Sequence, residues 1–168
     1  MTSEKGIESM QVRKELDEKL ELAASLGVSL GEMHGMSKKT LEGIYAYAYD
    51  FYEKGRLDDA EIFFKFLCIY DFENPDYVRG YAAVNQLKKE YQRAYDLYWI
   101  SFNFDKSNDY TVVLFMGQCQ LCLKNKEGAR ECFQIIINNS NDNELKDKAS
   151  AYLDFIDNAE SSAESESA

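Results

Sequence analysis

The chain repeats a small side chain and an aromatic ring at a nearly constant interval. Three alanines recur at steps of 34 and 35 residues: Ala60, Ala94 and Ala129. An aromatic ring follows each of them after four residues: Phe64, Tyr98 and Phe133. Another small residue precedes each of them by twelve residues: Ala48, Ala82 and Gly117. One structural unit, much shorter than a domain, therefore recurs along the chain.

A unit of about 34 residues with small residues at fixed positions is typical of the tetratricopeptide repeat, a helix–turn–helix hairpin. We predict an all-α tetratricopeptide-repeat solenoid with three such repeats, an N-terminal amphipathic helix and a C-terminal capping helix. Stacked units of this kind present an extended concave binding surface. The predicted ranges are 1–7 (disordered), 8–40 (N-terminal helix and linker), 41–158 (repeats at about 41–74, 75–108 and 110–143, then the capping helix) and 159–168 (disordered acidic tail).

Composition argues against several functional classes. The net charge of −11 opposes binding to nucleic acid, which needs clustered Lys and Arg. The sequence has no apolar run of roughly 18 residues, so no membrane span is predicted. The first ten residues are polar and include acidic ones, and they do not resemble a secretory signal. Cys119 and Cys122 have CxxC spacing, but no second pair or nearby histidine completes a zinc site, and His34 has no nucleophile beside it. We therefore expect a cytoplasmic protein that has no catalytic residue, no metal and no cofactor.

The first repeat carries more rings than its core needs. Tyr45, Tyr49 and Tyr52 are spaced by four and three residues, which places them on one stripe of a helix. The core of this repeat is assigned to other positions: Ile44, Tyr47, Ala48 and Phe51. The three tyrosines are therefore predicted to face the concave groove, because rings with a polar group are common at binding sites. The alternative is that they pack against the N-terminal helix as part of the core.

Equivalent positions in the later repeats, with their neighbours, complete the predicted groove. In the second repeat the equivalent residues are Arg79, Ala83 and Gln86, with Gly80 and Leu87 beside them. In the third repeat they are Leu114, Gln118 and Leu121, with Phe115 nearby. The small residues of the second repeat are expected to leave pockets between the larger side chains.

The N-terminal segment reads as a short amphipathic helix over residues 8–26. Its apolar residues recur at helical spacing between charged ones: Val12, Leu16, Leu20 and Ala23. A helix this short is marginal on its own, so it must pack either on its own first repeat or on a second chain. The residues alone leave both possibilities open.

The chain resembles the translocator chaperones of type III secretion, the LcrH/SycD family, and especially their invasion-associated branch. The resemblance covers residues 22–156, and it lies in these segments: IYAYAYDFYEKGRLDDAEIFFKFLCIYDFENPDY, AAVNQLKKEYQRAYDLY, FMGQCQLCLK and KDKASAYLDFI. It is more specific than the repeat pattern alone, because that pattern demands neither LCIYDF nor GQCQL.

The resemblance implies a bacterial cytoplasmic chaperone that works without ATP. Such a protein would hold an extended segment of two secreted pore-forming translocator proteins in its groove, where Tyr45, Tyr49 and Tyr52 would line the pockets. It also implies a homodimer whose interface would be formed by Val12, Leu16, Leu20 and Ala23 of the N-terminal helix. It further implies no direct contact with nucleic acid or membrane, and in some members a transcriptional activator as a further partner. Two alternatives remain: a regulatory adaptor acting with such an activator, and a general peptide-binding scaffold.

Overall fold

The structure, a computed structural model, describes residues 35–166. Within this range the chain forms helices and no strand: α3 (Lys38–Glu53), α4 (Leu57–Tyr70), α5 (Pro75–Leu87), α6 (Tyr91–Phe104), α7 (Thr111–Cys122), α8 (Lys126–Asn139) and α9 (Asn143–Glu166). The all-α fold expected from the sequence is confirmed. The predicted N-terminal helix and dimer interface, together with His34, lie outside the described residues.

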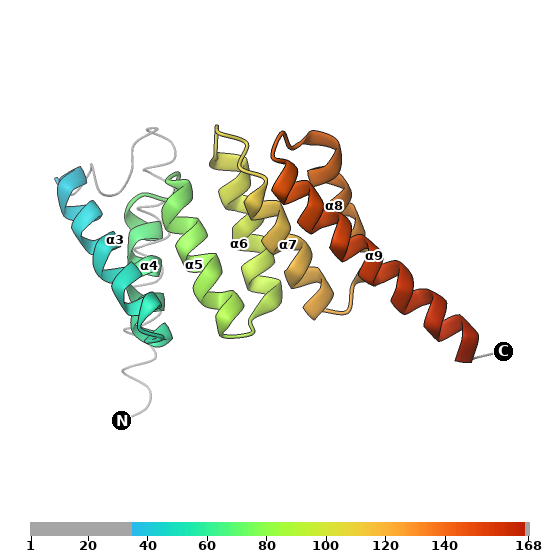
Figure 1. The fold of residues 1–168 in the computed structure, drawn as a ribbon. Helices are drawn as coiled ribbons and strands as arrows, with labels where there is room; N and C mark the ends of the chain where they lie inside the picture. Colours follow the sequence, from blue (N-terminus) through green and yellow to red (C-terminus); the bar gives the residue numbers. More distant parts are fainter. Residues whose placement is uncertain (1–34, 167–168) are drawn as a thin grey trace, which may run out of the picture.

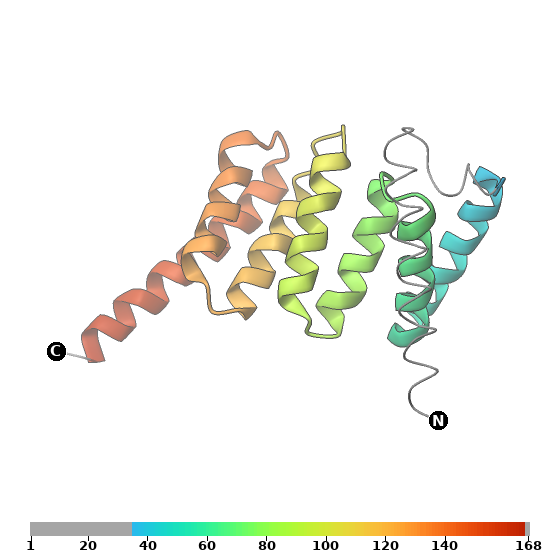
Figure 2. The same ribbon diagram turned by 180° about the vertical axis from the view of Figure 1, so that it is seen from behind.

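Consecutive helices form hairpins that stack side by side. The helix α3 packs on α4, α5 on α6 and α7 on α8, and each hairpin packs on the next one along the chain. Figure 1 shows α3, α5, α7 and α9 in the layer nearer to the viewer, and Figure 2 shows α4, α6 and α8 in the opposite layer. We call the layer of α3, α5, α7 and α9 the groove face.

The recurring small residues lie where helices touch. The alanines of the repeat have no exposed surface: Ala48, Ala60, Ala82, Ala94 and Ala129. The recurring rings are buried as well: Phe64, Tyr98 and Phe133. At Gly117, an added Cβ would lie 2.5 Å from the ring of Phe133, so only glycine fits there. The interval seen in the sequence is thus the interval between helix contacts in the core.

Short-range signals fix the helix ends. The side chain of Asn74 accepts a hydrogen bond from the Asp76 amide (3.1 Å), and Pro75 occupies the first turn of α5. Gly55 follows α3 with a φ of +71°, the left-handed conformation in which glycine commonly ends a helix. The start of α3 differs from the expected position near residue 41. The Ser37 hydroxyl accepts from the Thr40 amide (3.1 Å), and the helix therefore begins at Lys38.

The first helix also corrects one assignment to the core. Tyr47 was expected to be buried, but 65% of its surface is exposed. The neighbouring Ala48 is fully buried. Because successive residues of a helix point about 100° apart, the face that carries Ala48 turns the Tyr47 ring away from α4. The structure therefore places Tyr47 at the surface.

The last helix extends beyond its expected end. We expected the capping helix to stop at Asn158 and residues 159–168 to be disordered, but α9 continues to Glu166. The added residues are Ala, Ser and Glu, without glycine or proline, and Ala and Glu are good helix formers. The Ser161 hydroxyl also donates to the Asp157 carbonyl (3.0 Å). The structure thus corrects this boundary.

Candidate functional site

A cavity of about 230 Å³ opens on the groove face at the junction of the first two hairpins. It has eleven lining residues from five helices: Tyr45, Tyr49, Tyr52, Phe64, Asp76, Arg79, Gly80, Ala83, Gln86, Tyr98 and Phe115. Eight of the twelve residues assigned to the groove from the sequence lie on this wall. The remaining three lining residues, Phe64, Asp76 and Tyr98, were not predicted.

The tyrosine stripe of α3 forms one wall of the cavity. The ring centroids of Tyr45 and Tyr49 are 6.4 Å apart, and those of Tyr49 and Tyr52 are 6.0 Å apart. Tyr45 also meets Tyr77 of α5 at 5.5 Å, so it is the member tied most closely to the core. Tyr49 keeps 46% of its surface exposed. The alternative in which these rings pack on the N-terminal helix concerns residues outside the described range.

The hydroxyls of Tyr45 and Tyr52 remain protonated at neutral pH. Burial raises the pKa of Tyr45, and the Asp76 carboxylate raises it further. Burial and then the neighbouring Tyr49 raise the pKa of Tyr52. Both rings therefore offer a neutral O–H group together with an apolar face.

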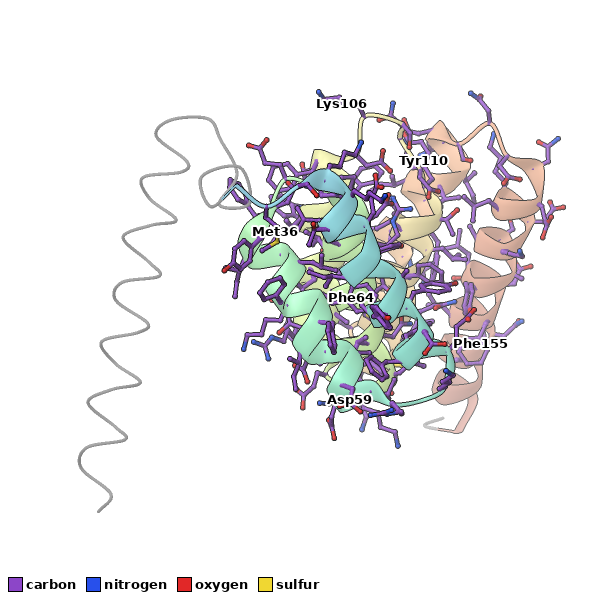
Figure 3. All side chains as sticks on the ribbon, turned by 90° about the vertical axis from the view of Figure 1, so that its left-hand side faces the viewer. Met36, Asp59, Phe64, Lys106, Tyr110 and Phe155 are labelled. Carbon is purple, nitrogen blue, oxygen red and sulfur yellow. The ribbon has the colours of Figure 1, made fainter. Side chains whose placement is uncertain are left out.

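Phe64 forms the floor of the cavity. It belongs to α4 but reaches α5, where its ring fills the space above Gly80, and Figure 3 labels its position inside the first hairpin. An added Cβ on Gly80 would clash with three ring carbons. Gly80 was expected to leave an open pocket. It instead admits the Phe64 ring, and the opening lies beside that ring.

A charged cluster closes the cavity on the α5 side. The guanidinium of Arg79 lies 2.8 Å from the Asp105 carboxylate, 3.3 Å from that of Asp109 and 3.8 Å from that of Asp76. Burial raises the pKa of Asp105, but hydrogen bonds from Ser107 and the charge of Arg79 outweigh that effect and hold the pKa below its usual value. Three carboxylates thus surround one guanidinium, so this wall offers little free positive charge to an acidic ligand.

Four predicted groove residues lie away from the cavity wall. Leu87 is 53% exposed, at the C-terminal end of α5, whereas Leu121 is half-buried against the core. Gln118 donates to Tyr152 of α9 and accepts from Gln86. Leu114 is only 6% exposed and shares a core cluster with residues of α8 and α9, so its assignment to the groove was wrong. The cause is that α7 is apolar on all sides, so its own pattern does not separate a groove side from a core side.

Two of the three missed residues have a common origin. Phe64 and Tyr98 are the rings that follow the repeat alanines by four residues, and the sequence did not assign this position to the groove. Both rings are buried, yet both also line the cavity. The signal was present in the repeat pattern, but a pattern of spacing does not say how deep a ring extends.

Comparison with known proteins places this geometry in a family. A tetratricopeptide-repeat family model matches residues 41–74 and 75–108. The chaperone protein SicA of Salmonella typhimurium is 49% identical over 144 residues, which cover 86% of this chain and 87% of SicA. YgeG of Escherichia coli K12, an uncharacterized protein, is 47% identical over 157 residues, or 91% of this chain and 96% of YgeG.

Solved structures give the same result. PcrH in complex with the chaperone-binding region of PopD superposes with a TM-score of 0.68 at 27% identity, covering 75% of this chain and 97% of that one. The Yersinia enterocolitica type III secretion translocator chaperone SycD superposes with a TM-score of 0.65, covering 75% and 96% of the two chains. At 23% identity the likeness to SycD shows the fold alone.

The stacked hairpins and their groove define a tetratricopeptide-repeat binding protein. The identity to SicA over most of both chains is too high to reflect the repeat alone, and the likeness to PcrH agrees with it. The chain belongs to the translocator chaperones of type III secretion. The resemblance found in the sequence is thereby confirmed. Across residues 35–166, no helix combines the length and apolar character needed to cross a membrane.

Proposed function

We propose that this chain binds an extended segment of a hydrophobic translocator protein in the groove face and keeps that client soluble in the bacterial cytoplasm until secretion. The proposed mechanism is sequestration, with no chemical step. A translocator with membrane-active segments would aggregate or insert early if it were free, and an apolar groove lowers its free concentration.

The aromatic cavity is the observation that carries this proposal. Six of its eleven lining residues are rings, which suit apolar side chains. Its volume of about 230 Å³ is below the roughly 300–1,000 Å³ of typical small-molecule sites. The cavity therefore fits single side chains of a polypeptide better than a cofactor. PcrH, solved with the PopD region and with the PopB region, supports a client of this kind.

We further propose that one groove serves two clients in turn. PcrH offers the parallel, since it was solved with chaperone-binding regions of two different proteins. A homodimer formed through Val12, Leu16, Leu20 and Ala23 stays part of the proposal, supported by the dimer described for SycD. A transcriptional activator as a further partner rests on the family resemblance only.

Capture from the native host tests the proposal. The tagged chain and its Tyr49→Ala variant would be purified in parallel, and the co-purifying proteins would be identified by mass spectrometry. We expect two secreted proteins with long apolar segments on the wild-type chain, both depleted on the variant. A DNA-binding protein captured in their place would favour the adaptor. Equal capture by the two chains would show that the cavity is not the client site.

A further inference from the structure

A chain of hydrogen bonds leads from the cavity to α9 along the groove face. The Tyr98 hydroxyl donates to Oε1 of Gln86 at 2.8 Å. Nε2 of Gln86 donates to Oε1 of Gln118 at 3.2 Å, and Nε2 of Gln118 donates to the Tyr152 hydroxyl oxygen at 3.0 Å. We call these four residues the amide ladder. Figure 1 shows that three of their helices, α5, α7 and α9, lie side by side.

The direction of this ladder determines what it still offers to a ligand. Each glutamine amide carries two N–H groups, and the ladder uses one of them in each case. The Tyr152 oxygen accepts in the ladder, so its own proton remains available. Gln86, Gln118 and Tyr152 therefore present a row of three spare donors. None of the three side chains is fully buried, so a ligand in the groove can reach them.

A row of neutral donors matches a particular ligand chemistry. An extended polypeptide presents a main-chain carbonyl to one side at every second residue, about 7 Å apart. A helical segment uses its carbonyls internally and has few to offer. Main-chain carbonyls are also the same in every sequence, so contacts to them suit a groove that serves more than one client.

We propose that the groove has two unlike halves: the aromatic cavity takes an apolar side chain of the client, and the amide ladder donates hydrogen bonds to main-chain carbonyls of the client's extended segment. This inference rests on the proposed function and adds Tyr152 of α9 to the binding residues. The helix α9 then acts as the last wall of the groove as well as a cap on the core.

Tyr152 is suited to a test of the ladder because its ring packs in the core while its hydroxyl belongs to the ladder. The ring stacks on Phe133, with centroids 4.8 Å apart and planes at 7°. Tyr152→Phe removes the hydroxyl and leaves that stack in place. Gln118→Met keeps a side chain of similar length and removes the amide. Matched controls that lie off the cavity wall and the ladder are Tyr47→Phe on exposed α3 surface and Gln134→Met on exposed α8 surface.

The probes are synthetic peptides of the chaperone-binding regions of PopD and PopB, the segments with which PcrH was solved. Affinity would be measured by fluorescence anisotropy for the full chain, and thermal unfolding would be recorded for every variant. We expect Tyr152→Phe and Gln118→Met each to weaken binding about 5-fold, the net effect of a typical hydrogen bond. The two controls are expected to bind like wild type.

A second series of peptides separates binding from a structural role. Each peptide would carry one main-chain ester in place of an amide, which weakens one carbonyl as an acceptor. An ester opposite the ladder is expected to weaken binding to wild type and to add little in the Tyr152→Phe variant, the signature of a coupled pair. If the ester opposite the ladder costs the Tyr152→Phe variant as much affinity as esters at the other positions do, the ladder has only a structural role and the inference fails.

The remaining outcomes distinguish this inference from the proposed function. If the ladder variants bind like wild type while Tyr49→Ala does not, the cavity holds the client and the ladder does not. If wild type binds neither peptide, the proposed function fails in this form and the ladder inference falls with it.

Discussion

The ring of Phe64 lies over Gly80 and fills the space that a side chain at this position would occupy. The first hairpin therefore packs on the second where the second has no side chain. Phe64 is only 1% exposed. A second ring lies over a glycine at Phe133 and Gly117. In both places the ring reaches the backbone of a neighbouring helix, and this contact sets the distance between the two helices.

Gly80→Ala should destabilise the fold. Alanine is the better helix former by about 1 kcal/mol, but the added methyl group would clash with the Phe64 ring, and overpacking costs about 1–3 kcal/mol. The expected net result is a lower free energy of unfolding in urea. Gly43→Ala is the matched control, since nothing lies within 4 Å of a Cβ at that exposed helical position. Gly43→Ala should be neutral or stabilising, and equal effects of the two changes would contradict the packing argument.

The sequence predicted the parts of the fold that depend on local chemistry. The repeat alanines were recognisable because each acts through its own small size, and all of them are buried. The tyrosine stripe of α3 was placed on the groove by helical spacing alone, and it lines the cavity.

The remaining features depend on contacts between distant segments. Leu114 was misassigned because it belongs to a core cluster built from several helices, and spacing within one helix does not report such packing. Gly80 was read as an open pocket because the ring that fills it comes from the previous hairpin. Tyr152 was not considered for the groove because its bond to Gln118 joins two helices 34 residues apart in sequence.

Tyr49→Ala should weaken client binding more than it weakens the fold. The ring lines the cavity with nearly half of its surface exposed, so its removal costs little core packing. A loss of about 1–3 kcal/mol in binding is the scale of interface hot spots. Titration calorimetry with a captured client segment measures it. Tyr47→Ala, which removes an exposed ring off the cavity wall, is the control, and unchanged affinity together with a large drop in Tm at Tyr49 would return the stripe to the core.

Ala94→Glu should unfold the second hairpin. Ala94 has no exposed surface, so a glutamate there adds volume and a buried charge without a partner. The expected cost exceeds about 3 kcal/mol, the range of severe core changes. Circular dichroism during thermal unfolding checks it. Gln134→Glu adds a similar charge on the exposed face of α8 and should leave Tm nearly unchanged. An Ala94→Glu variant that melts with the wild type would falsify the alignment of the repeats.

Replacing Leu16 and Leu20 with Glu should give a folded monomer. The reason is that the stripe they belong to is predicted to form the dimer interface, while the hairpins from α3 onward have a core of their own. Light scattering at several concentrations measures the mass, and circular dichroism checks the fold. A wild-type chain that is monomeric throughout the micromolar range would make the helix an intramolecular cap. An unfolded double variant would place the helix in the core.

Stability should fall as the solution becomes alkaline. Burial raises the pKa of Cys68 and Cys119 from the ordinary value of 9.0 to about 12, and that of Cys132 to about 11. These thiols are neutral in the fold at a pH where the unfolded chain has lost their protons. A raised pKa therefore contributes stability that is fully present below about pH 9 and is lost as the pH rises toward 12. Burial raises the pKa of Tyr45 and Tyr52 in the same direction.

The same burial predicts which thiols react. At pH 8 a disulfide reagent should modify Cys122 quickly, because among the cysteines it alone is exposed. Cys119 and Cys132 are buried and should react slowly, at a rate set by opening of the fold, and the half-buried Cys68 should react more slowly than Cys122. Cys122→Ser should remove the fast phase and leave the urea stability unchanged. Two or more fast thiols in the native protein, or a free energy of unfolding that stays constant between pH 8 and pH 11, would contradict the burial of Cys68, Cys119 and Cys132.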